Sequence, residues 1–215
     1  MTMQGILSIL ARQRFLPLLF ILAVGSVTSV ESDDDWKLTQ EKNGVSIYYR
    51  PSKKDPKLRE MKINVTVSGN REDVINHLKD EGLIKKWMQG LEFQHVSIVD
   101  SMCWIAVQGF EFPWPISNKV NRMEYRRQEA GTTTYIFLKS LPMSQSLPKG
   151  YEEMSPTEGQ WEIHKLNTRQ LVVIYKVRAL QESPYPRWVQ DPIIQKSFLT
   201  SFDRLRTSVQ SLANN

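Results

Sequence analysis

The residue types that most often perform catalysis or bind metal ions are few in this sequence and widely spaced. The three histidines are His77, His95 and His164, and none has a second ligand at metal-binding spacing. No glycine-rich phosphate loop, nucleophile elbow or HExxH sequence occurs. Glu152 and Glu153 are adjacent in a predicted loop, unlike a spaced catalytic pair. We therefore expect no metal, no cofactor and no catalytic residue.

Cys103 is the only cysteine, so the chain can form no internal disulfide. It lies in an apolar, strand-like run, which predicts a buried thiol. A reactive thiol would need an exposed, electropositive setting. We therefore expect packing alone to stabilise the domain.

Four charged residues lie on predicted strands: Arg122, Glu124, Arg126 and Lys176. An inward arginine–glutamate pair could hold the polar head group of a ligand. Such residues more often form the solvated face of an antiparallel sheet. The sequence favours the solvated face and leaves the other interpretation open.

Alternation of apolar and polar residues predicts about eight antiparallel strands. Residues 45–49 and 61–67 flank a proline-bounded turn and are expected to form a hairpin. Residues 36–38 are expected to be a short helical entry, and residues 141–159 a long irregular loop of the kind that often forms a lid. The remaining strands are expected at residues 93–99, 102–110, 118–127, 132–138, 160–166 and 169–178.

In two regions the apolar residues are spaced as in a helix rather than alternating as in a strand. Asn70 can cap a helix whose first turn carries acidic residues, and Gly82 is expected to divide this region into two short helices. A long amphipathic helix is predicted after Pro186, with an irregular or kinked first turn near Pro192. Six residues form its apolar face, at successive spacings of four, four, three, four and three positions: Ile194, Phe198, Phe202, Leu205, Val209 and Leu212.

These elements predict an α+β, helix-grip fold. A sheet of this size curls, and a long helix with a wide apolar face must bury that face. The economical arrangement is a curved antiparallel β-sheet wrapped around the long C-terminal helix. This arrangement leaves a cleft between the helix and the sheet.

The chain resembles the START family, the lipid-transfer domains related to the steroidogenic acute regulatory protein. The resemblance extends from about Trp36 to Leu212 and rests on the order and spacing of several segments. It departs from the family where Lys119 and Val120 replace the usual basic–acidic pair, and where the usual glycine pair before the last helix is missing. The segments that carry it are NGVSIYYRP, IKKWM, PWPISN and PYPRWVQDPIIQKSFLTSFDRLR.

The resemblance implies a hydrophobic cavity whose mouth lies at the PWPISN corner. Prolines would hold this corner rigid, although its aromatic residues could instead simply plug one end of the core. A cavity for a lipid is mostly apolar with a few polar anchors, and tyrosines suit that role. Alternation alone does not distinguish the wall of a cavity from a filled core. The predicted wall or gate residues are Trp104, Phe112, Trp114, Met123, Tyr125, Tyr135, Phe137, Met143, Trp161, Ile163, Tyr175, Phe198 and Phe202.

The N-terminus has the pattern of a secretory signal peptide, expected at residues 1–29. Arg12 and Arg14 precede the apolar run of residues 15–24, and small residues follow. The run is shorter than the roughly 20 residues of a membrane span, although an uncleaved anchor is the alternative. Residues 30–35 form an acidic leader, and residues 36–213 the START-like domain.

Export to the periplasm of a Gram-negative cell is the expected localisation, with a eukaryotic secretory route as the alternative. The net charge of +5 falls to +3 without Arg12 and Arg14. This mild charge permits contact with a membrane surface but gives no clustered stripe for nucleic acid, so nucleic-acid binding is not expected. We expect a monomer.

The function predicted from these features is non-enzymatic binding, and possibly transfer, of a lipid or other hydrophobic ligand. One alternative is an enzyme of the cyclase or aromatase type, which would need a buried acid or base with a shifted pKa. The other is an interaction module with a filled core. The sequence does not identify the ligand.

Overall fold

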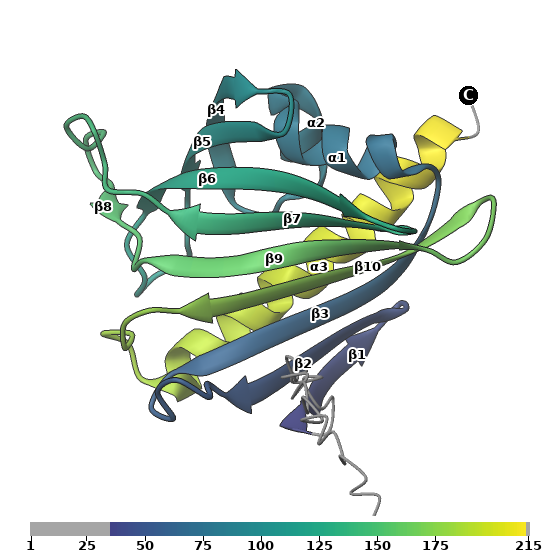
Figure 1. Cartoon of the computed structure of the whole chain (residues 1–215). Helices are drawn as coiled ribbons and strands as arrows, with labels where there is room; N and C mark the ends of the chain where they lie inside the picture. The colour runs from purple at the N-terminus through teal and green to yellow at the C-terminus, as the bar shows by residue number, and fades with distance from the viewer. Residues whose placement is uncertain (1–34, 214–215) are drawn as a thin grey trace, which may run out of the picture. The chain divides into compact units, whose positions relative to one another are not determined.

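The computed structural model describes residues 35–213, which belong to one compact unit, Asp33–Asn215. The predicted signal peptide and nearly all of the predicted acidic leader lie outside the described residues. The described chain forms the expected α+β, helix-grip fold, with one ten-stranded sheet and a long C-terminal helix (Figure 1).

The sheet is antiparallel apart from the short strand β8, which pairs in parallel with β6. Its strand order is β1-β2-β3-β10-β9-β7-β6-β5-β4. Because β3 pairs with β10, the N-terminal hairpin joins the strands that precede the last helix. The strands are β1 (Lys37–Lys42), β2 (Val45–Pro51), β3 (Arg59–Ser68), β4 (Leu91–Asp100), β5 (Cys103–Phe110), β6 (Lys119–Ala130), β7 (Thr133–Ser140), β8 (Glu152–Glu153), β9 (Thr157–Lys165) and β10 (Gln170–Ala179).

The predicted hairpin of β2 and β3 is confirmed, with Ile47 opposite Ile63 on the buried face. The helical entry predicted at residues 36–38 is wrong, because β1 forms there and pairs with β2. All six residues of β1 are exposed, so this edge strand shows no apolar alternation that would reveal it. Asn43 and Gly44 turn the chain between β1 and β2, both with positive φ, as an asparagine–glycine turn allows.

Two short helices, α1 (Arg71–Lys79) and α2 (Glu81–Trp87), follow the hairpin. Asn70 caps α1 as predicted, and its side chain and that of Asp73 form a reciprocal capping box. The predicted break at Gly82 is misplaced, because Asp80 ends α1 and its carboxylate caps α2. Gly82 is an early residue of α2, where its backbone N–H donates to that carboxylate.

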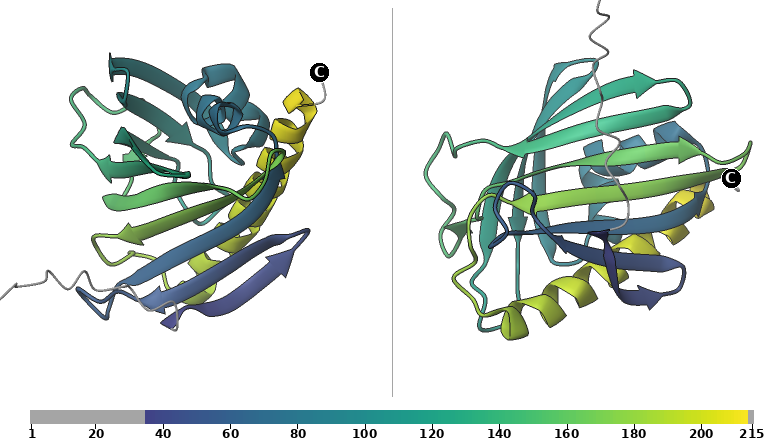
Figure 2. Two further views of the ribbon diagram at one scale, coloured as in Figure 1. Left: turned by 45° about the vertical axis from the view of Figure 1, so that its right-hand side comes forward. Right: turned by 60° about the horizontal axis from the view of Figure 1, so that its bottom comes forward.

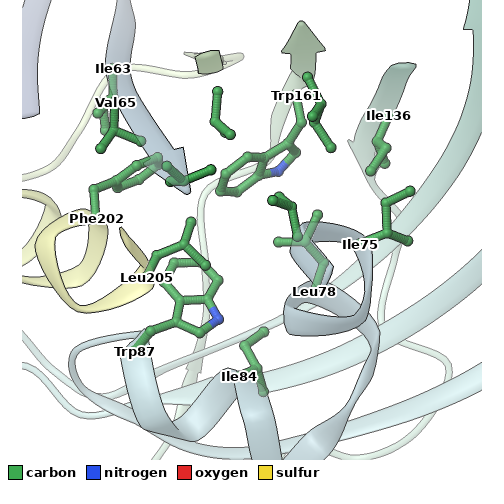
Figure 3. Close-up of a cluster of buried hydrophobic side chains, with 14 of the residues drawn as sticks. Ile63, Val65, Ile75, Leu78, Ile84, Trp87, Ile136, Trp161, Phe202 and Leu205 are labelled. Carbon is green, nitrogen blue, oxygen red and sulfur yellow. The ribbon is translucent and has the colours of Figure 1, made fainter. Parts of the chain in front are cut away.

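The long helix α3 (Arg187–Ala213) lies across the concave face of the curved sheet, with α1 and α2 beside its C-terminal part (Figure 2). It continues through Pro192, near which the sequence predicted an irregular or kinked turn. The core between these layers contains Trp87, Trp161 and Phe202, with ring centroids 5.4 to 6.2 Å apart (Figure 3). Apolar burial against α3 therefore connects the sheet to the helical layer.

The segment predicted as one irregular loop, residues 141–159, is partly structured. It contains β8, and β9 begins within it at Thr157. The backbone N–H groups of Glu152 and Met154 donate to carbonyls of Asn118 and Val120 at the start of β6. These bonds hold the end of the segment beside the PWPISN corner. They depend on partners distant in the sequence, which local pattern does not reveal.

Candidate functional site

A pocket of about 680 Å³ lies between the concave face of the sheet and α3. Side chains of β2, β3, β5, β6, β7, β9 and β10 line it on the sheet side, and the three helices line the other side. The segments around residues 110–119, 154–157 and 180–186 line one end, which we call the mouth. The size lies within the range of about 300–1,000 Å³ typical of small-molecule sites.

The interior of the pocket is apolar and aromatic. Tyr175 of β10 packs between Trp161 and the two phenylalanines of α3, Phe198 and Phe202, with ring centroids 4.6 to 6.0 Å away. Met123 of β6 lines the sheet side. Such a wall removes apolar surface of a ligand from water, which contributes roughly 25 cal/mol per Å².

The charged side chains that line the pocket lie at the mouth. Arg59 at the start of β3 forms an ion pair with Asp191 in the first turns of α3. Lys119 at the start of β6 bonds to Glu152 at 2.6 Å. Burial, and then the nearby Asp191 carboxylate, raise the pKa of Tyr49 to about 12, so its hydroxyl stays protonated near neutral pH. The mouth is therefore polar. Two of its cations, Arg59 and Lys119, are already paired with carboxylates.

Farther inside, an uncharged hydrogen-bonded chain replaces the ion pairs. Gln108 of β5 donates to Gln94 of β4 at 2.6 Å, and Gln94 donates to the Leu78 carbonyl at 3.2 Å. The Tyr125 hydroxyl donates to Gln108 at 3.4 Å. Burial raises the pKa of Tyr125 and of Tyr175, so both remain neutral hydroxyls. Gln108, Tyr125 and Tyr175 all line the pocket.

The structure brings seven of the predicted wall or gate residues to the pocket. They come from the corner, two central strands, β10 and α3, and are Phe112, Met123, Tyr125, Trp161, Tyr175, Phe198 and Phe202. Periodicity correctly placed those on strands and α3 on inward faces.

The other six predicted residues do not line this pocket. Trp104 is fully buried beside the pocket, on the strand next to Tyr125, and the centroids of the two stacked rings are 5.0 Å apart; Ile163 is part of the filled core. Tyr135 and Phe137 stack on each other on the opposite face of the sheet, because Ile136 and Leu138 between and beside them point inward. Trp114 at the corner and Met143 in the loop after β7 also lie outside the pocket lining.

The pocket also contains residues outside the predicted set of wall and gate residues. Gln108, Asn121, Tyr49 and the Arg59–Asp191 pair are polar, and Met61, Met88, Met154 and Ile194 are apolar. Apolar alternation had marked Tyr49 and Met61 as inward-facing, and helical periodicity had placed Met88 and Ile194 on apolar helix faces. Met154 is one of two methionines of the predicted loop 141–159 whose flexible side chains suit a ligand contact. The glutamine pair carries no local signal, since its two members meet only through strand pairing.

The PWPISN corner forms part of the mouth but does not present all its rings to the pocket. Phe112 and Ile116 line the pocket, whereas Trp114 is 91% exposed. The Ser117 backbone N–H donates to the Tyr185 hydroxyl at 3.4 Å, which joins the corner to the segment leading into α3. The next turn carries Trp188, which is 80% exposed. Two exposed indoles thus lie on connected segments of the mouth.

The four charged residues that the sequence analysis singled out on strands lie outside the pocket lining. Glu124 contacts Lys139 at 3.2 Å and Arg126 at 3.7 Å, and Lys176 bonds to Glu162 at 2.7 Å. Arg122 donates to a carbonyl in the loop after β7. None of these residues lines the pocket, so the pairs stabilise neighbouring strands.

The described residues, 35–213, contain neither a metal-binding cluster nor a membrane-spanning helix. No group of three or more histidine, cysteine, aspartate or glutamate side chains there could hold a metal ion. No described helix has the length and apolar character that crossing a membrane requires.

The architecture and pocket correspond to a known class of fold. The chain has a START-like, helix-grip fold, as solved structures of StAR-related lipid transfer domains show. No family model matches the sequence, and no curated protein matches it.

Three solved structures illustrate the likeness. The STAR-related lipid transfer protein of Xanthomonas axonopodis is 21% identical with a TM-score of 0.72, over 82% of this chain and 99% of that one. Human StAR-related lipid transfer protein 5 is 18% identical with a TM-score of 0.71, over 85% and 89%. The Zhui aromatase/cyclase of Streptomyces sp. R1128 is 11% identical with a TM-score of 0.51, over 71% and 93%. At these identities the likeness shows the fold alone.

Proposed function

We propose that this protein binds a lipid or other hydrophobic molecule, without chemical change, in the pocket between the sheet and α3. The observation that carries the proposal is a pocket of about 680 Å³ with an apolar, aromatic interior. The similar structures named as lipid transfer proteins support it. Apolar burial supplies the affinity, and exchange requires the mouth to open.

The pocket favours binding over the two alternatives. A filled interaction module would leave no space of this size. An enzyme of the aromatase/cyclase type would need an acid or base poised near neutral pH. Burial instead moves the pKa of Tyr125 and of Tyr175 away from neutrality. These two hydroxyls therefore do not favour the enzymatic function.

Native mass spectrometry tests the binding proposal on protein purified from a cell extract without detergent, with lipid extraction in parallel. We expect a bound mass that is lost on denaturation. Val177→Trp, which adds a large ring to the pocket wall, should reduce the bound mass, whereas Val172→Trp on the opposite face of the sheet should not. A wild-type protein that carries no ligand, and also takes up neither a fluorescent sterol nor a fatty acid, would contradict the proposal.

We also propose that the protein is exported, as the basic–apolar–small pattern of residues 1–29 supports. The periplasm of a Gram-negative cell is the compartment we favour. Fractionation of the native host followed by N-terminal sequencing tests this. A cytoplasmic protein that retains Met1 would contradict it.

Transient contact with a membrane surface is the third part of the proposal. Trp114 and Trp188 are exposed on connected segments of the mouth, and indole rings favour the interface between lipid and water. A ligand that left the mouth there would pass directly into lipid.

A further inference from the structure

Charge is distributed unevenly along the pocket. Its lining includes six charged residues: Lys57, Arg59, Lys119, Glu182, Arg187 and Asp191. They occupy strand starts, the first turns of α3 and the segments beside them, all at the mouth. Farther along α3 the lining residues are uncharged: Ile194, Ser197, Phe198, Ser201 and Phe202. The interior therefore has no ion to offer a ligand among the described residues.

The interior does offer neutral hydrogen-bonding groups. Gln108 and Gln94 are 2% and 1% exposed, and their amides are fixed by the chain that ends at the Leu78 carbonyl. The amide of Gln108 retains a second N–H and a second lone pair. The Tyr125 hydroxyl donates to this amide, which leaves its oxygen free to accept a hydrogen bond.

Tyr175 adds a second hydroxyl to the same region. It lines the pocket, and no residue among 35–213 accepts or donates a hydrogen bond at its hydroxyl. Tyr125 and Tyr175 line the same pocket, on β6 and β10, and burial raises the pKa of Tyr175, so its hydroxyl stays neutral. Tyr175 is only partly buried, and its hydroxyl is not fully enclosed by protein atoms, so it faces the open space of the pocket. Tyr175 is thus positioned to bond a ligand.

We infer that the ligand carries an uncharged oxygen group, a hydroxyl or a ketone, which binds Gln108, Tyr125 and Tyr175 at the inner end of the pocket. This inference rests on the proposed function and specifies its ligand class. A hydroxyl can accept from Tyr175 and donate to Tyr125 or Gln108, and a ketone can accept only. A carboxylate or phosphate at the inner end would be buried without a cation, which is strongly unfavourable.

A matched set of fluorescent probes tests the inference: pyrenebutanol, pyrenebutyrate and butylpyrene, which differ only in a hydroxyl, a carboxylate or no polar group. Binding of each is measured by fluorescence titration of the purified wild-type protein and of the double variant Tyr125→Phe, Tyr175→Phe. We expect the double variant to bind pyrenebutanol about tenfold more weakly, from the loss of hydrogen bonds. Its affinity for butylpyrene should not change, and the wild type should bind pyrenebutyrate more weakly than pyrenebutanol.

Tyr135→Phe is the matched control, because Tyr135 lies on the opposite face of the sheet. This substitution should leave the affinities for all three probes unchanged. If the double variant does not fold, Tyr175→Phe alone decides the test, since its hydroxyl has no protein bond to lose. Equal losses for pyrenebutanol and butylpyrene, or no loss, would overturn the inference while leaving hydrophobic binding intact. A wild type that binds none of the probes would overturn the inference and the proposed function together.

Discussion

Gly159 lies on β9 where the neighbouring strand passes too close for any side chain. A Cβ atom there would lie 2.1 Å from the Lys176 carbonyl oxygen and 2.9 Å from the Val177 Cα, both backbone atoms of β10. Glycine in a strand often marks such a close approach. Its neighbours Thr157 and Trp161 line the pocket, so this approach shapes the wall.

Gly159→Ala should destabilise the protein by about 1–3 kcal/mol or more, because backbone atoms must move to admit the methyl group. Urea unfolding followed by circular dichroism measures the change. Gly131→Ala is the control: it adds the same methyl group in open space at φ +59° and should cost only about 1–2 kcal/mol from the left-handed backbone. A cost at Gly159 no larger than at Gly131 would show that the strands separate easily.

The apolar face of α3 contributes both to the core and to the wall of the pocket. Phe202 is 1% exposed and contacts Trp87, Trp161 and Tyr175. Phe198, one turn earlier, is only partly buried and lines the pocket nearer the mouth. Both rings line the pocket, but Phe202 is also fully buried in the core, whereas Phe198 is only partly buried.

Phe202→Ala should lower the free energy of unfolding by about 3–5 kcal/mol, as expected for a buried phenylalanine. Phe198→Ala should cost clearly less but weaken the uptake of a hydrophobic probe. Chemical unfolding and fluorescence titration of both variants measure the two effects. Equal loss of stability in the two variants would mean that Phe198 is core rather than wall.

His77 joins α1 to α3 in a buried contact. Its Nδ1 lies 2.6 Å from the Asp73 carbonyl oxygen, and its Nε2 lies 2.8 Å from the Ser208 hydroxyl. The Nδ1–H therefore donates to the carbonyl, and the neutral Nε2 accepts from the hydroxyl. Burial lowers the pKa of His77 below its usual 6.5, against the opposing effects of the Asp73 carbonyl and carboxylate.

Stability should therefore fall as the pH drops below about 6.5, because the unfolded histidine takes up a proton that the folded one resists. The contribution of His77 to the free energy of unfolding is complete above about pH 6.5. It is lost as the pH falls through the lower pKa that His77 has in the folded protein. Urea unfolding at about pH 7.5 and about pH 5.5 measures it. His77→Gln should reduce the acid loss, whereas His95→Gln, at an exposed site, should not. An identical loss in all three proteins would remove His77 as the cause.

The elements that could be predicted are those whose burial is one-sided. Alternation revealed β2 and β3, and the spacing of Phe198, Phe202 and Leu205 revealed α3, because each buries a single face. Exposed β1 and two-residue β8 have no such face, and strand pairing alone places them. The same limit applies to the pocket, where periodicity gave the inward faces. It could not show that Trp104 stacks beside Tyr125 without lining the pocket, or that Gln94 and Gln108 meet.

The two ends of the pocket differ in their chemistry. Its polar mouth carries paired charges and exposed indoles, and its apolar interior ends at neutral hydroxyl and amide groups. A ligand with a weakly polar group would enter with that group leading. The corner, the segment around Tyr185 and the start of α3 form the mouth together, so opening there would not disturb the core of Trp87 and Phe202.

This asymmetry predicts how the protein would meet a membrane. Replacing Trp114 and Trp188 together by alanine should weaken binding to anionic phospholipid vesicles about tenfold or more, because two indoles lose their burial in the interface. Co-sedimentation with vesicles measures it. The net positive charge should make wild-type binding weaker on zwitterionic vesicles and at high salt. Leu166→Ala removes an exposed apolar residue at the opposite end of β9 and should have no effect. If the double variant bound vesicles as wild type does, the mouth would not be the membrane contact, and ligand exchange would have to take place through water.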